Sequence, residues 1–267
     1  MVLALGSSAQ TKPSALDEAR PFAFGEVRSL NSAILGEERV LNIFLPDGYS
    51  PDSAATYPVI YVLDGSANED FPHIAGLAQF MNMYDLLPKS IVMGIANVDR
   101  RRDFTHTTRS DSDKVWVPTN GGSALFIDFL AKELQPFVDA HYRTSGARTI
   151  IGQSLGGLLA TEILFHRPDL FEDYIIVSPS LWWDDGSLAA AADVWVKTNG
   201  STAKRIFFAM ARDDDWSKPQ VDHVVNVLRE HSAAPLQWWY VPFPEETHAT
   251  ILHRAVYRAF EVMNGRK

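Results

Sequence analysis

The sequence contains no cysteine among its 267 residues. Without thiols the chain can form neither a disulfide framework nor a thiolate metal site, and it has no cysteine nucleophile. Basic residues are outnumbered by acidic ones, 24 against 33, which gives a formal net charge of −9. A chain of this charge has no extended positive field with which to displace counterions from phosphate, so a general nucleic-acid binder is excluded.

Long apolar runs, metal motifs and cofactor motifs are also missing. No apolar run approaches the roughly 20 residues that a membrane-spanning helix needs, so no membrane span is expected. No H-x-x-x-H pair or aspartate–histidine cluster indicates a metal site. The glycine-rich segment 152–157 lacks the G-x-G-x-x-G spacing of a dinucleotide-binding turn. We therefore predict an enzyme or binding protein that uses neither metal nor cofactor.

The N-terminus differs in character from the rest of the chain. Residues 1–10 are apolar and then small, as in the end of a secretory signal, but no basic segment precedes them. A flexible leader fits equally well, so both an exported and a cytoplasmic protein remain open. We predict an arm over residues 1–20 and a single domain over residues 21–267. The sequence does not indicate an oligomeric state.

From residue 22 onward, strand and helix patterns alternate. Residues 22–34 and 39–45 resemble an antiparallel pair at a sheet edge, and the nearly continuous apolar run 57–63 is typical of a central strand. Residues 98–120 form a long charged loop, a length that often marks a lid or a binding loop. Further strands are predicted at 91–97, 149–151, 174–177, 206–210 and 236–241, and helices at 71–87, 121–142, 187–196, 219–230 and 250–263. This alternation predicts an α/β fold with a mostly parallel sheet and helices on both faces.

The segment around Ser154 carries the strongest chemical signal. Residues 152–156 read Gly-Gln-Ser-Leu-Gly, which is the G-x-S-x-G nucleophile elbow, between a β-branched run and an apolar helix. A side chain at Gly152 or Gly156 is expected to collide with neighbouring backbone. The turn would lift the serine hydroxyl above the sheet, with a helix N-terminus beneath it to favour developing negative charge.

A serine nucleophile needs a base and an acid that orients the base, and both should follow later strands at the carboxyl edge of the sheet. His248 follows the strand at 236–241 and precedes the last helix, which makes it the candidate base; His253 is the alternative. Three aspartates follow the strand at 206–210, of which Asp214 is favoured over Asp213 and Asp215 on loop length. The oxyanion hole should combine the N–H of Leu155 with that of Ser66 or Gly65.

Five stretches resemble the putative esterase family of α/β-hydrolases, in particular the branch of siderophore trilactone esterases. These stretches are Tyr61–Gly65, Asn97–Thr105, Gly152–Gly157, Ser178–Trp183 and Glu246–His248. The resemblance implies an α/β-hydrolase fold in which Ser154 is the nucleophile, His248 the base and Ser66 and Leu155 the oxyanion donors. The acid of the family follows the seventh strand, consistent with Asp214. Two positions depart from the branch: Gln153 replaces a histidine and His106 a proline.

Substrate contacts are predicted from residues after strands that meet the same edge. Trp182 and Trp183 could line an acyl or aryl pocket, although either could equally pack under the following loop, and Gln153 borders the nucleophile. Arg102 could bind a substrate carboxylate or catecholate, although pairing with nearby aspartates is the simpler alternative.

These residues together predict a serine carboxylesterase that acts on a small-molecule ester: a short-chain ester, an aryl ester or a siderophore-type lactone. Acyl transfer to an alcohol by the same residues remains an alternative. A binding module with an inactive site is a further one.

Overall fold

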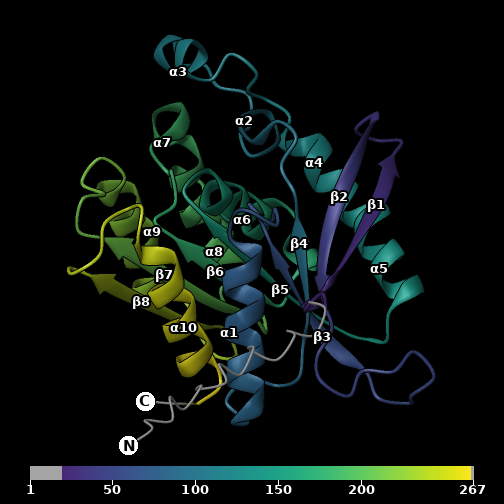
Figure 1. Cartoon of the computed structure of the whole chain (residues 1–267). Helices are drawn as coiled ribbons and strands as arrows, with labels where there is room; N and C mark the ends of the chain where they lie inside the picture. The colour runs from purple at the N-terminus through teal and green to yellow at the C-terminus, as the bar shows by residue number, and fades with distance from the viewer. Residues whose placement is uncertain (1–19, 266–267) are drawn as a thin grey trace, which may run out of the picture.

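One sheet of eight strands organises the protein (Figure 1). The computed structural model describes residues 20–265, so the predicted arm lies outside the described residues except for Arg20. The strand order is β1-β2-β4-β3-β5-β6-β7-β8. The β1–β2 and β2–β4 pairs are antiparallel, and all pairs from β4 to β8 are parallel. The strands are β1 (Glu26–Ser32), β2 (Glu37–Phe44), β3 (Tyr57–Val62), β4 (Ile91–Ile95), β5 (Thr144–Gln153), β6 (Asp173–Val177), β7 (Arg205–Ala211) and β8 (Gln237–Phe243).

Helices cover both faces of this sheet, as the alternation of strands and helices predicts. Successive side chains of β3 point to opposite faces, so Val59 and Tyr61 belong to one apolar cluster and Ile60 and Val62 to the other. The second cluster is completed by α1 (Phe71–Met83) and α10 (Ile251–Met263), which lie side by side in Figure 1. The first cluster is completed by α4 (Ser123–Phe129), α5 (Gln135–His141), α6 (Leu155–His166), α8 (Ala192–Asn199) and α9 (Lys218–His231).

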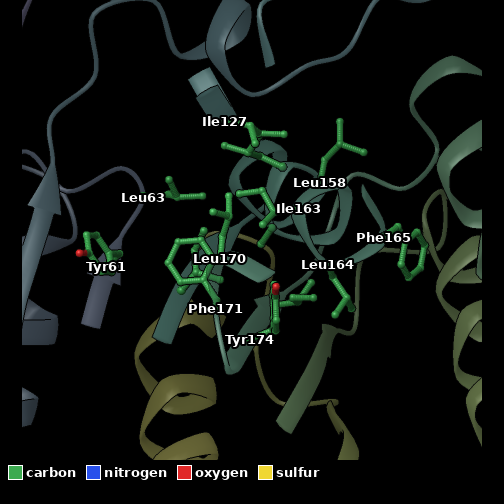
Figure 2. Close-up of a cluster of buried hydrophobic side chains, with 14 of the residues drawn as sticks. Tyr61, Leu63, Ile127, Leu158, Ile163, Leu164, Phe165, Leu170, Phe171 and Tyr174 are labelled. Atoms are coloured by element: carbon green, nitrogen blue, oxygen red, sulfur yellow. The ribbon is translucent and has the colours of Figure 1, made fainter. Parts of the chain in front are cut away.

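The core beneath α6 keeps the start of that helix in place. Figure 2 shows side chains of α6, among them Ile163 and Leu164, in the same apolar cluster as Phe171 and as Tyr61 and Tyr174 of the sheet. Phe171 makes edge-to-face contacts with Tyr61 at 5.6 Å and with Tyr174 at 6.1 Å between ring centroids. Such pairs contribute about 0.5–1.5 kcal/mol beyond their buried area. This buried layer packs against α6, the helix that follows Ser154.

The long helix predicted over 121–142 is not regular. It runs as α4, then as a π-helical turn from Leu130 to Leu134, and then as α5. Pro136 explains the change, because it lacks an N–H and its ring clashes with the carbonyl four residues earlier. In the described residues, no helix is both long and apolar enough to cross a bilayer.

The predicted loop 98–120 contains two short helices, α2 (Arg100–Asp103) and α3 (Asp111–Trp116), so the expectation of an irregular loop was only partly correct. It is held against α7 (Trp183–Ala190) by Asp184, a residue in the left-handed region at φ 52°. The Asp184 carboxylate accepts hydrogen bonds from the Arg109 N–H at 2.6 Å and the Thr108 hydroxyl at 3.0 Å. These bonds fix α2 and α3 near α7, at the top of Figure 1.

Candidate active site

The β5–α6 turn has the geometry of a nucleophile elbow. Ser154 lies between the two elements with φ 59° and ψ −119°, a strained conformation for a residue with a side chain. A Cβ at Gly152 would approach the carbonyl oxygen of Gly156 to 2.3 Å, so only glycine fits there. The same expectation for Gly156 is wrong, because a Cβ there would meet Asp64 Oδ2 at an ordinary 3.4 Å. Gly157 is the crowded position instead, at 2.9 Å from Pro179 Cα.

Asp214 and His248 come together in the loops after β7 and β8. Their Oδ1 and Nδ1 atoms are 2.6 Å apart, and Asp214 is only 2 % exposed. Burial alone would raise the pKa of the Asp214 carboxyl, but hydrogen bonds from His248, Ser178 and the Ala211 N–H outweigh it and hold this pKa below its usual range. An ionised carboxylate at this position fixes the tautomer of the imidazole and can stabilise its protonated form.

Asp213 and Asp215, the two alternatives, are exposed. Asp213 nevertheless has a part in the loop, since its Oδ1 accepts the backbone N–H of His248 at 2.7 Å. Gln153, predicted to face the substrate, instead donates from its Nε2 to the carbonyl oxygen of His248. That hydrogen bond links the residue beside Ser154 directly to the histidine loop.

The Ser154 hydroxyl is oriented toward Ser180, with the two Oγ atoms 3.3 Å apart. Within residues 20–265 no hydrogen bond joins it to His248. Catalytic hydrogen bonds of this kind often form only when substrate is bound.

The two backbone donors predicted for the oxyanion hole differ in availability. Leu155 is the first residue of α6, where an N–H has no acceptor within the helix, and the Ser66 N–H has no acceptor among the described residues either. Gly65 is ruled out, because its N–H donates to the Ile95 carbonyl at 3.0 Å. A glycine is needed there for another reason: a Cβ would lie 2.4 Å from Gly94 Cα.

Arg100 ties the loop after β3 to the elbow. Its Nε and Nη2 contact Asp64 Oδ1 and Oδ2 at 2.5 and 2.9 Å, and its Nη2 also reaches the Gln153 carbonyl at 3.3 Å. Asn97 donates to the same Asp64 Oδ1 at 2.7 Å. Asp64 itself has φ 55°, so these bonds hold a strained residue two positions before Ser66. The sequence pointed to the arginine run but not to this role.

Comparison with known proteins agrees with this geometry. A family model described as "Putative esterase" matches residues 32–237. The chain belongs to that family. The esterase is 28 % identical to the ferri-bacillibactin esterase BesA of Bacillus subtilis over 258 residues, which cover 88 % of this chain and 87 % of the relative. It is 33 % identical over 149 residues, 53 % of this chain and 50 % of the relative, to a siderophore triacetylfusarinine C esterase of Aspergillus fumigatus.

Solved structures support the same assignment. An IroE-like serine hydrolase from Shewanella oneidensis superposes with a TM-score of 0.77 at 30 % identity, covering 90 % of this chain and 79 % of that one. The esterase therefore has the α/β-hydrolase fold and is a carboxylic ester hydrolase, as predicted from its sequence. Among its described residues, no group of three or more potential ligands is arranged to hold a metal ion.

Two of the predicted substrate-binding residues of the esterase have structural partners instead. Arg102 contacts Glu37 through Nη2 at 2.5 Å and Asp103 through Nε at 2.8 Å, so its guanidinium is occupied by a carboxylate cluster. Trp183 is fully buried and donates from Nε1 to the His106 carbonyl at 2.9 Å. Arg102 is thus paired with carboxylates, and Trp183 is part of the buried core. Trp182 remains partly exposed and contacts two further tryptophans.

Glu162 is a buried ionisable group that sequence reasoning missed. It lies on α6, two turns beyond Ser154, and burial raises its pKa to about 7 although the Ser123 hydroxyl donates to Oε1 at 2.9 Å. His106 Nδ1 lies 3.8 Å from the other carboxylate oxygen, and burial lowers the pKa of this histidine. Both side chains line a cavity of about 260 Å³.

This burial predicts a pH-dependent stability. Because folding raises the pKa of Glu162 from 4.5 to about 7, the folded state binds more protons in that interval, and the free energy of unfolding falls as pH rises through it. The loss amounts to about 3 kcal/mol. Glu162→Gln, which keeps the acceptor for Ser123, should be more stable than the wild type at pH 8 and nearly equal to it at pH 4.5. Urea denaturation at both pH values measures the difference.

An exposed glutamate provides the matched control for that experiment. Glu230→Gln removes the same charge from the surface of α9 and should shift stability little at either pH. If Glu162→Gln changed the free energy of unfolding equally at pH 4.5 and pH 8, its carboxyl group would not titrate between them, and the burial argument would be wrong.

Proposed function

We propose that the protein is a serine esterase in which Ser154 attacks the ester carbonyl. His248 takes the serine proton and then donates it to the leaving alcohol, while Asp214 keeps the imidazole oriented. Water activated by His248 then releases the acid from the acyl-enzyme. The observation that carries this proposal is the 2.6 Å contact of the buried Asp214 with His248, in a loop hydrogen-bonded to the residue beside Ser154.

The tetrahedral intermediate formed at Ser154 carries a negative oxygen that needs two donors. The free N–H groups of Leu155 and Ser66 are the proposed pair, and the N-terminus of α6 adds its positive end. The Arg100–Asp64 ion pair holds the loop that presents Ser66. Because such donors are already oriented before the reaction, they stabilise the intermediate without further reorganisation.

For the substrate we propose an ester or lactone of the siderophore type. Relatives from two kingdoms are named for such activity: the ferri-bacillibactin esterase and the triacetylfusarinine C esterase. The two names refer to different siderophores, so they support cleavage of a siderophore-type ester more than they support any one siderophore.

An active-site probe tests the nucleophile. A fluorophosphonate reacts only with a serine activated by its neighbours, and we expect a single labelled residue, Ser154. Intact mass and peptide mapping would identify it. Absence of labelling under conditions that label a reference serine hydrolase would contradict the proposal, and so would labelling at another serine such as Ser180.

A further inference from the structure

Three tryptophans from separate segments form a row that ends at the candidate base. Trp116 lies at the end of α3, Trp182 just before α7, and Trp216 two residues after Asp214. Ring centroids are 5.1 Å apart for Trp116 and Trp182 and 5.4 Å apart for Trp182 and Trp216. The ring of Trp216 is in turn 5.8 Å from that of His248. We call Trp116, Trp182 and Trp216 the tryptophan row.

The outer members of the row are unusually exposed for residues of their size. Trp116 is 47 % and Trp216 48 % exposed, which leaves a large aromatic surface in water. The position of Trp116 is nevertheless fixed, since Asp113 on the same helix accepts the Asp184 N–H at 2.8 Å. A contiguous exposed aromatic surface that is fixed by buried polar contacts and begins at the catalytic histidine is suited to contact the substrate.

A positive charge lies at the far end of the row. The guanidinium carbon of Arg101 is 5.4 Å from the Trp116 ring centroid, and its Nη1 donates to the Trp116 carbonyl at 3.2 Å. Arg100 and Arg102 are both paired with carboxylates, whereas Arg101 has no carboxylate partner in the described part of the chain. The protein has a net charge of −9, but the guanidinium of Arg101 is a local positive charge to which an anionic group could bind.

We propose that the tryptophan row and Arg101 bind an anionic aromatic part of the ester substrate. The inference rests on the proposed function, because it takes the scissile ester to lie between Ser154 and His248. Aromatic rings of the substrate stack on Trp216 and Trp182, and a carboxylate or phenolate at the distal end pairs with Arg101. Three rings in succession accommodate more than one substrate ring, so the row selects long aryl substrates over short-chain esters.

A graded set of methyl esters tests this selectivity. The set contains a cinnamate with one ring and a biphenylacrylate with two, each with and without a terminal carboxylate, and 4-nitrophenyl acetate as the small reference. For the two-ring carboxylate, Trp116→Leu should lower kcat/KM relative to the reference ester about five-fold, and Arg101→Gln about ten-fold. For the two-ring ester without the carboxylate, Arg101→Gln should leave that ratio nearly unchanged.

Arg109→Gln is the matched control, because it removes the same charge from an exposed position of the same loop. The inference is overturned if Trp116→Leu and Arg101→Gln change the ratio no more than this control does. Titrating each protein with biphenyl-4,4′-dicarboxylate and following tryptophan fluorescence measures binding without turnover. An unchanged Kd in Arg101→Gln also overturns the inference, whereas tight binding without hydrolysis of any ester contradicts only the proposed function.

Discussion

Ser154→Ala is expected to lower kcat by about 10⁵- to 10⁶-fold on any ester that the protein hydrolyses. The alanine cannot form an acyl-enzyme, so only the oxyanion donors and substrate binding remain to accelerate attack by water. KM should change little, because the hydroxyl contributes to the transition state more than to the bound ester. Steady-state kinetics with 4-nitrophenyl acetate, at enzyme concentrations high enough to detect the residual rate, provides the measurement.

Ser180 supplies a matched control for this variant. Its hydroxyl is 3.3 Å from that of Ser154, but it lies after β6, outside the β5–α6 turn that carries the G-x-S-x-G sequence. Ser180→Ala should lose no more than about ten-fold in kcat, because only the orientation of Ser154 changes. If activity survived Ser154→Ala but not Ser180→Ala, the nucleophile would be Ser180 and the proposed role of Ser154 would be wrong.

The parts of the site that could be predicted from the sequence are those determined by topology. In a parallel sheet the loops after β7 and β8 meet at the same edge, so the proximity of Asp214 and His248 follows from the order of strands alone. The elbow is similarly local, because the crowding at Gly152 arises from residues four positions away. For these residues, chain order and spacing carried enough information.

The roles of the remaining site residues depend on the direction in which each side chain points. The spacing of residues along the sequence does not determine that direction. Three consecutive arginines follow β4, yet one contacts Asp64, one lies over Trp116 and one contacts Glu37 on β2. A shift of one position along a short helix changes the direction of a side chain by about 100°. The prediction selected Arg102, whereas Arg101 is the one of these three arginines that has no carboxylate partner among the described residues.

The same limit applies to the adjacent tryptophans, for which the sequence left both pocket lining and packing open. Trp182 and Trp183 are neighbours in sequence, but one lines the open row and the other is fully buried beneath the loop that carries His106. Trp116 and Trp216 gave no signal of their own, because their relation to Trp182 exists only after three distant segments are packed together. Gly65 likewise fitted the pattern of an oxyanion donor until its N–H proved to be paired with Ile95.

Asp214→Asn should lower kcat about 10⁴-fold while the fold remains intact. The amide can still accept the Ala211 N–H, which now binds Oδ2 at 3.1 Å. It lacks the negative charge that stabilises a protonated His248, and its NH₂ group facing Nδ1 would favour the tautomer with the proton on the wrong nitrogen. Since hydrogen bonds hold the pKa of Asp214 below its usual range, the wild type keeps this charge at neutral pH and in mild acid.

Asp213→Asn separates the role of the acid from that of the loop. Asp213 binds the backbone of His248 rather than its ring, so its loss should affect only the position of the loop and lower kcat by about ten-fold at most. Comparing kcat of the two variants on one ester, with thermal unfolding to check that both are folded, decides between the carboxylates. A larger loss in Asp213→Asn than in Asp214→Asn would show that the buried contact with the imidazole is structural and that the catalytic acid is the exposed aspartate.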